Sequence, residues 1–219
     1  MKVRLIRHTD FADELAGMAA ALCYNGKNVR RSLEVAMEGH HESVMEHATF
    51  TFLVEGVSRV LLAQLTRHRL ASFSVQSQRY VKYDKGVGYV IPPKIVDLGD
   101  EAVQEYTMQM ETMQRWYREW CQKLGKDGQE DARFVLPGAC ETTLMMTMNA
   151  RELRHFFSLR CCSRAQWEIR RLANEMLRLC KQVSPALFED AGPGCVRGAC
   201  PEGKKSCGRK AGQNDGTQV

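Results

Sequence analysis

The longest regular segment of this sequence, Asp100 to Leu124, is predicted to form one amphipathic helix that ends at the glycines of residues 125–128. Shorter helical patterns are expected over residues 10–24, 32–38, 57–68, 149–160 and 165–183. Strand patterns are expected near residues 48–55, where Thr alternates with Phe, and over residues 142–148, which are rich in Met and Thr. The sequence therefore predicts an α+β fold in which helix and strand are mixed in a single domain.

Composition places the chain among ordinary globular proteins. It has 219 residues, 44% hydrophobic and 26% charged. No apolar run approaches the ~20 residues needed to span a bilayer, and the start, MKVRLIRHTDF, lacks a signal-peptide core. We therefore expect a cytoplasmic protein with no membrane partner, whose nine cysteines stay reduced.

The net charge of +5 is unevenly distributed. The segment from Gly192 to Val219 carries five Lys/Arg and two acids, so it contributes +3 and leaves +2 for the rest. We expect one folded domain over residues 1–191 and a flexible Gly/Cys/basic tail over 192–219. A body so near neutrality lacks the broad positive field of a general nucleic-acid binder, so no nucleic-acid partner is expected.

The positive charge that matters is local. The segment Arg67 to Tyr80, RHRLASFSVQSQRY, holds three arginines, a histidine and three serines but no acid. Arginine forks and serine hydroxyls suit phosphate and carbonyl groups, which predicts a nucleotide site in a non-helical loop. The residues alone leave open a second interpretation, a basic arm over residues 67–82 that binds RNA and loses affinity steeply with salt.

A second cluster, GHHESVMEH at residues 39–47, gathers His and Glu. Its spacing does not match the H-E-x-x-H zinc pair, and the pattern from Ser43 to Glu46 predicts a helix capping box instead. In the tail, Cys195, Cys200 and Cys207 lack the paired C-x-x-C of zinc sites. No metal is expected.

The third segment is the predicted helix NARELRHFFSLR, capped by Asn149. Eleven residues make nearly a whole number of turns, so Asn149 and Arg160 share a face, while Arg151 and His155 share a neighbouring stripe. Three cysteines, at positions 140, 161 and 162, are nucleophile candidates by residue type alone. No partner base lies beside them in sequence, which favours buried small hydrophobes.

Together these segments resemble the flavin-dependent thymidylate synthase family. The signature Arg-His-Arg, two residues, Ser, four residues, Ser, one residue, Arg stands here as Arg67, His68, Arg69, Ser72, Ser77 and Arg79. The GHHES–EH, DARFVLP and NAREL…LR…AQWEIR segments follow in the family's order, so the resemblance covers about residues 1–190. Many members carry Asn-Glu where this chain has Ser74-Val75, and Gln76 is the nearest polar substitute.

The resemblance implies a methyltransferase that converts dUMP to dTMP. It implies FAD as the cofactor that delivers the hydride, NADPH as the reductant of FAD, and 5,10-methylenetetrahydrofolate as the carbon donor. It also implies long helices packed on a small sheet, and a homotetramer whose subunits share active sites. No G-x-G-x-x-G follows a predicted strand, so a Rossmann-type FAD site is not expected. Two alternatives stay open: the RNA-binding arm over residues 67–82, and a flavin enzyme acting on another pyrimidine nucleotide.

The resemblance also implies roles for individual residues. Arg160 would be the catalytic residue, close to the base. The residues implied on the flavin side are Arg67, His68, Arg69, Leu70, His41, Ser43, Asn149, Arg151 and His155. The residues implied at the dUMP site are Gln64, Arg67, Ser77, Gln78, Arg79, Arg133 and Arg160.

Overall fold

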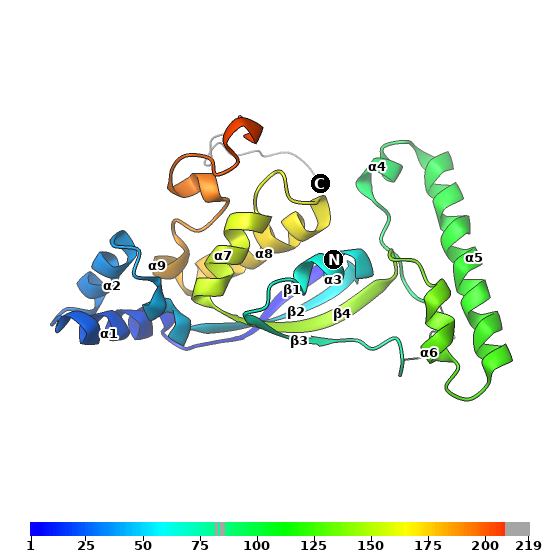
Figure 1. Ribbon diagram of the computed structural model, residues 1–219, viewed down its shortest axis with the longest axis horizontal. Helices are drawn as coiled ribbons and strands as arrows, with labels where there is room; N and C mark the ends of the chain where they lie inside the picture. The colour runs from blue at the N-terminus through cyan, green and yellow to red at the C-terminus, as the bar shows by residue number, and fades with distance from the viewer. Residues whose placement is uncertain (82, 84–85, 209–219) are drawn as a thin grey trace. The chain divides into compact units, whose positions relative to one another are not determined.

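A computed structural model describes residues 1–81, 83 and 86–208 of the chain (Figure 1). Its sheet has four strands in the order β1-β2-β4-β3. They are β1 (Lys2–His8), β2 (Thr49–Ser58), β4 (Glu141–Asn149) and β3 (Ala71–Val75). The neighbouring strands run antiparallel, which confirms the α+β prediction of helices combined with a small sheet.

The chain divides into two compact units, and each is described by itself. The first comprises residues 1–2, 54–67 and 74–145, and the second comprises residues 3–53, 68–73 and those from 146 onward. In the described part of the chain, no helix is both long enough and apolar enough to cross a membrane.

The first unit contains the long helix α5 (Asp100–Leu124), with the bounds that the sequence predicts. It also contains α3 (Arg59–Leu65), α4 (Pro93–Val96), α6 (Gln129–Ala132) and a 3₁₀ turn, η2 (Arg133–Val135). A buried cluster that includes Tyr117 of α5 and Cys140 forms part of its core. Gln114 of α5 holds the loop backbone, because its amide donates to the Val87 carbonyl at 2.6 Å.

The second unit contains two groups of helices. The N-terminal pair is α1 (Ala12–Tyr24) and α2 (Val29–Glu38), followed by the 3₁₀ helix η1 (Glu42–His47). Gly17 lets the pair pack closely, because a Cβ there would lie 2.7 Å from the Val29 carbonyl oxygen. The C-terminal group comprises α7 (Ala150–Arg160), α8 (Trp167–Val183), α9 (Pro185–Phe188), η3 (Gly194–Arg197) and η4 (Gly203–Lys205).

Aromatic side chains form the core beneath the C-terminal helices. Phe50 of β2 meets Phe188 edge-on, with ring centroids 5.3 Å apart, and Phe157 of α7 meets Phe188 at 6.0 Å. All three side chains are fully buried. This packing fixes α7 against the strands of its unit, and α7 carries several of the predicted site residues (Figure 1).

Several local predictions were wrong. Residues 67–80 are not all loop, because β3 occupies Ala71–Val75, and the strand β1 was not predicted at all. The helix predicted over 57–68 is only α3, which ends at Leu65. The helix expected from residue 10 begins at Ala12, after Phe11 in the left-handed conformation.

The tail boundary at residue 192 stays a prediction. Two 3₁₀ turns lie beyond it. Arg164, which precedes this boundary in the sequence, lies 3.5 Å from Glu202. Residues 209–219 of the predicted flexible tail lie outside the described residues.

Candidate active site

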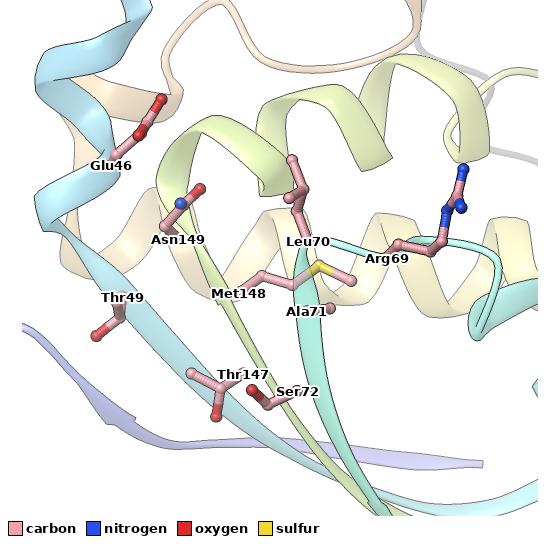
Figure 2. Close-up of a pocket in the computed structure, with 9 residues that line it drawn as sticks. All are labelled: Glu46, Thr49, Arg69, Leu70, Ala71, Ser72, Thr147, Met148 and Asn149. Carbon is pink, nitrogen blue, oxygen red and sulfur yellow. The ribbon is translucent and has the colours of Figure 1, made fainter.

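A pocket of about 370 Å³ opens at one end of the sheet in the second unit. Figure 2 shows its lining, drawn from η1, the first residue of β2, the segment around the start of β3, and the end of β4. The lining residues are Glu46, Thr49, Arg69, Leu70, Ala71, Ser72, Thr147, Met148 and Asn149.

The pocket combines an apolar surface with polar donors. Leu70 is 75% exposed and Met148 lies beside it, while Arg69 and Asn149 supply N–H groups (Figure 2). Such a mixture is typical of small-molecule and cofactor sites, in which a few polar groups set the orientation. Three predicted flavin-side residues, Arg69, Leu70 and Asn149, thus meet in one pocket.

Asn149 also begins α7. Its side-chain oxygen accepts a hydrogen bond from the Glu152 backbone N–H at 2.8 Å, as the predicted cap requires. The Asn149 side chain therefore faces the pocket while it fixes the first turn of the helix that carries Arg151, His155 and Arg160.

The predicted capping box at Ser43 is wrong. The segment Glu42–His47 forms a 3₁₀ helix whose first residue is preceded by His41, with no side-chain cap. Glu46 pairs instead with Arg151, at 2.5 Å, and Glu42 lies 3.8 Å from Arg151 and 3.3 Å from Arg197. The Glu46 contact raises the pKa of Arg151. This charged network brings the His41–Ser43 segment to the first turn of α7.

His68 lies buried alongside α7, with 6% of its surface exposed. Its Nδ1 lies 3.2 Å from a Glu152 carboxylate oxygen, and its Nε2 accepts from Arg160 Nε at 3.1 Å. Phe156 packs edge-on against the ring at 4.9 Å, and the His155 ring lies at 6.2 Å.

Burial, followed by the charges of Arg160 and His155, lowers the pKa of His68 to about 4. Burial also raises the pKa of Glu152. Although the carboxylate is close enough for an ion pair, the imidazole is neutral near pH 7, so this contact is a hydrogen bond from a neutral ring. The structure thus brings together the predicted residues His68, His155 and Arg160.

The first unit holds the other predicted residues. Arg79 pairs with Glu130 of α6 through two contacts, Nε–Oε1 at 2.9 Å and Nη2–Oε2 at 3.0 Å. Arg133 donates to the Glu130 carbonyl at 2.9 Å, and Ser77 Oγ accepts from the Arg79 backbone at 3.1 Å. Arg79 and Arg133 therefore both contact Glu130, while Ser77 contacts Arg79. The hydrogen bond with Glu130 raises the pKa of Arg79.

The remaining predicted residues of this unit are placed less specifically. Gln64 lies in the last turn of α3, Arg67 follows that helix, and Gln78 lies in the turn after β3. In the second unit, the exposed His41 meets the Tyr24 ring edge-on at 5.6 Å.

Two of the three candidate cysteines, Cys140 and Cys161, are poor nucleophiles. Cys140 is fully buried and Cys161 is 8% exposed. Burial raises the pKa of Cys140 to about 11 and that of Cys161 to about 12. Both are thiols near pH 7, and the thiolate is the nucleophilic form.

In residues 1–81, 83 and 86–208, no group of three or more His, Cys, Asp or Glu is placed to hold a metal ion. The tail cysteines Cys195, Cys200 and Cys207 belong to those residues.

Sequence reasoning missed the acids of the site. Glu152, Glu130 and Glu46 each accept from a residue that was predicted to bind a ligand. Two of these acids carry a signal in the sequence: Glu152 stands three residues after the Asn149 cap, and Glu130 stands three residues before Arg133. Their partners lie 84 and 51 positions away, respectively, so the pairing itself depends on the fold.

The fold and these clusters define an α+β protein with sites suited to anionic, ring-containing ligands. The family model described as "Thymidylate synthase complementing protein" matches residues 4–186. A flavin-dependent thymidylate synthase of Geobacter sulfurreducens is 47% identical over 96% of this chain and 95% of its own length. One of Clostridium tetani is 45% identical over 96% of this chain and 94% of its own length.

This chain belongs to that thymidylate synthase family, and the resemblance stated from the sequence is confirmed. Among solved structures, the flavin-dependent thymidylate synthase ThyX of Helicobacter pylori, complexed with FAD and dUMP, superposes with a TM-score of 0.71. It is 23% identical, and the match covers 88% of this chain and 100% of that one, which supports the fold.

Proposed function

We propose that this protein is a flavin-dependent thymidylate synthase that converts dUMP to dTMP. The observation that carries the proposal is the 47% identity with a flavin-dependent thymidylate synthase over 96% of the chain. The proposed carbon donor is 5,10-methylenetetrahydrofolate, and the proposed reductant of the flavin is NADPH. We further propose a cytoplasmic homotetramer in which subunits share active sites.

The pocket of the second unit supports the flavin side of the proposal. Leu70 offers apolar surface, and Arg69 and Asn149 offer donors for ring carbonyls. FAD held there would supply the hydride. The proposed flavin-side residues are Arg67, His68, Arg69, Leu70, His41, Ser43, Asn149, Arg151 and His155.

The proposed nucleotide residues divide by chemistry. Arg79 and Ser77 suit the phosphate of dUMP, because a guanidinium fork and a hydroxyl both donate to phosphate oxygens. Gln64, Gln78, Arg67 and Arg133 complete the proposed set. Arg160 is the proposed catalytic residue: a fixed cation at the uracil carbonyls stabilises negative charge as the ring gains nucleophilic character.

Anaerobic turnover tests the proposal. The purified protein should be yellow, NADPH should bleach its flavin absorbance, and dUMP with methylenetetrahydrofolate should then yield dTMP. Turnover of another pyrimidine nucleotide in place of dUMP would redirect the substrate assignment. A colourless protein that binds RNA in a steeply salt-dependent way would overturn the enzyme assignment.

A further inference from the structure

We propose that Glu152 is a positioning residue that fixes the tautomer of His68 and, through that ring, the orientation of the Arg160 guanidinium. The three side chains form a continuous chain of hydrogen bonds within one unit, with contacts of 3.2 Å and 3.1 Å. The side chains of His68 and Glu152 are only 5% and 6% exposed, so bulk water cannot replace either partner. Glu152 was assigned no role by the family resemblance.

The chemistry of the contacts assigns the proton on the ring. Arginine Nε carries an N–H and accepts no hydrogen bond, so at the Arg160 contact His68 Nε2 must be the acceptor. A neutral imidazole with an acceptor Nε2 carries its proton on Nδ1. That N–H points at the Glu152 carboxylate, which accepts it. A doubly protonated ring would lose the Arg160 contact, because Nε2 would then be a donor.

Helix α7 is built to present this chain. Glu152, Phe156 and Arg160 are spaced four residues apart, so they lie along one stripe of the helix. The acid is at the first turn and the arginine at the last, and the His68 ring bridges them above Phe156. The other titratable group facing the ring is His155, at 6.2 Å.

The backbone of Glu152 is also fixed. Its N–H donates to the Asn149 cap at 2.8 Å, so the residue stands at the third helical position. A carboxylate is favoured there by the helix dipole, which offsets part of the cost of burying its charge. Glu152 is thus anchored in the first turn of α7, next to the pocket residue Asn149, while it orients Arg160 in the last turn through His68.

This inference rests on the proposed function, in which Arg160 stands at the pyrimidine and His68 on the flavin side. A lone buried histidine would need only some acceptor for its N–H. Positioning requires more: removal of the carboxylate must change the ring's tautomer and the chemical step together.

Nitrogen NMR of ¹⁵N-histidine-labelled protein tests the tautomer directly, with the His68 signals assigned from a His68→Gln sample. In the wild type near pH 7 the ring should be neutral with its proton on Nδ1. Glu152→Ala removes the acceptor of the Nδ1–H, so the ring is no longer held against Arg160 and should give a mixture of tautomers. Glu152→Gln, whose amide oxygen can still accept, should keep Nδ1–H. A protonated ring or an Nε2–H ring in the wild type overturns the proposal, whether or not any variant folds.

Kinetics supply the second measurement. Glu152→Ala should lower kcat for dTMP formation by about 10- to 100-fold, the scale for losing an outer partner of a functional histidine, with bound FAD retained. Glu152→Gln should recover most of this loss. Glu175→Ala is the matched control, since Glu175 forms an exposed pair with Arg178 on α8. It should change neither the tautomer nor kcat.

The outcomes separate the two proposals. An inactive wild type refutes the proposed function, while its tautomer still reports on Glu152. An active wild type whose Glu152→Ala variant keeps either the tautomer or full kcat overturns the positioning role.

Discussion

At the scale of single residues, Arg79 has a counter-charge from elsewhere in its unit. The segment around it contains no acid, yet Glu130 contacts its guanidinium at 2.9 Å and 3.0 Å. Both side chains are nearly half exposed, so solvent screens the pair and its net contribution to stability is small. A phosphate dianion carries more charge than one carboxylate and can replace Glu130 as the acceptor of the Arg79 guanidinium.

Arg79→Ala should therefore weaken dUMP binding about 10- to 100-fold, because a charge-assisted contact to phosphate is lost. Bound FAD should persist. Isothermal titration with dUMP measures the effect, and Glu130→Gln serves as the matched control. If Glu130→Gln weakened dUMP as strongly as Arg79→Ala, the ion pair itself, and not a phosphate contact, would account for the loss.

The buried thiols lead to a second prediction at this scale. Because burial raises the pKa of Cys140 to about 11 and of Cys161 to about 12, neither supplies a thiolate at neutral pH. Replacing both, together with Cys162, by Ala should leave measurable dTMP synthesis. Arg160→Ala should cost a factor of about 100 or more, the scale for one preorganised electrostatic group.

Flavin content must first show that the triple variant is folded. A flavin-loaded but inactive triple variant, beside an active Arg160→Ala enzyme, would assign the chemistry to a cysteine adduct.

At the scale of elements, Asn149 serves two structures at once: it caps α7 and lines the pocket. Asn149→Ala should lower the free energy of unfolding by about 1 kcal/mol through the lost cap, and should also weaken FAD binding. Asn149→Asp keeps an acceptor for the Glu152 N–H but loses the amide donor. It should therefore preserve stability while still weakening FAD binding, as measured by denaturant melts and flavin fluorescence.

Gln166 provides the control. Its side chain caps α8 by accepting from Glu168 N at 3.0 Å and Ile169 N at 3.1 Å, and it does not line the pocket. Gln166→Ala should reduce stability without altering flavin affinity. If Asn149→Asp bound FAD as tightly as the wild type, the role of Asn149 would be restricted to capping α7.

The sequence predicted some elements well and others not, for identifiable physical reasons. Helix α5 has a long amphipathic repeat and a glycine stop, and both of its ends were predicted. Strand β3, ASFSV, also alternates, with every second side chain more exposed. Its serines resemble loop composition, so the strand is recognisable only once β4 pairs with it.

At the scale of the whole molecule, family and fold class followed from the signature and the mixed periodicity. The strand order did not follow from the sequence, because β2 pairs with β4, which lies far away in the chain. The hydroxyls of Thr51 and Thr147 lie 2.9 Å apart, although 96 positions separate the two residues. The two clusters of proposed site residues divide similarly. Their cationic residues stand out in the local sequence, while the acids that pair with them come from distant segments and were missed.

The buried histidine makes the stability of the whole fold depend on pH. The pKa of His68 is about 4 in the folded protein against an ordinary value of 6.5. Between these two values the unfolded chain binds a proton that the folded protein does not, so the free energy of unfolding must fall as the pH falls through this window. The slope from this one group approaches about 1.4 kcal/mol per pH unit, and it vanishes above the window and below it.

Urea melts of the wild type and His68→Gln at pH 7.0 and at about pH 5, inside this window, measure the effect. The raised pKa of Glu152 acts in the opposite direction, since a folded state that holds a carboxyl proton more tightly loses stability as the pH rises. We expect the wild type to lose more stability on acidification than His68→Gln, whose amide can serve both neighbours without titrating. Equal losses in the two proteins would mean that His68 is protonated as easily in the folded state as in the unfolded chain.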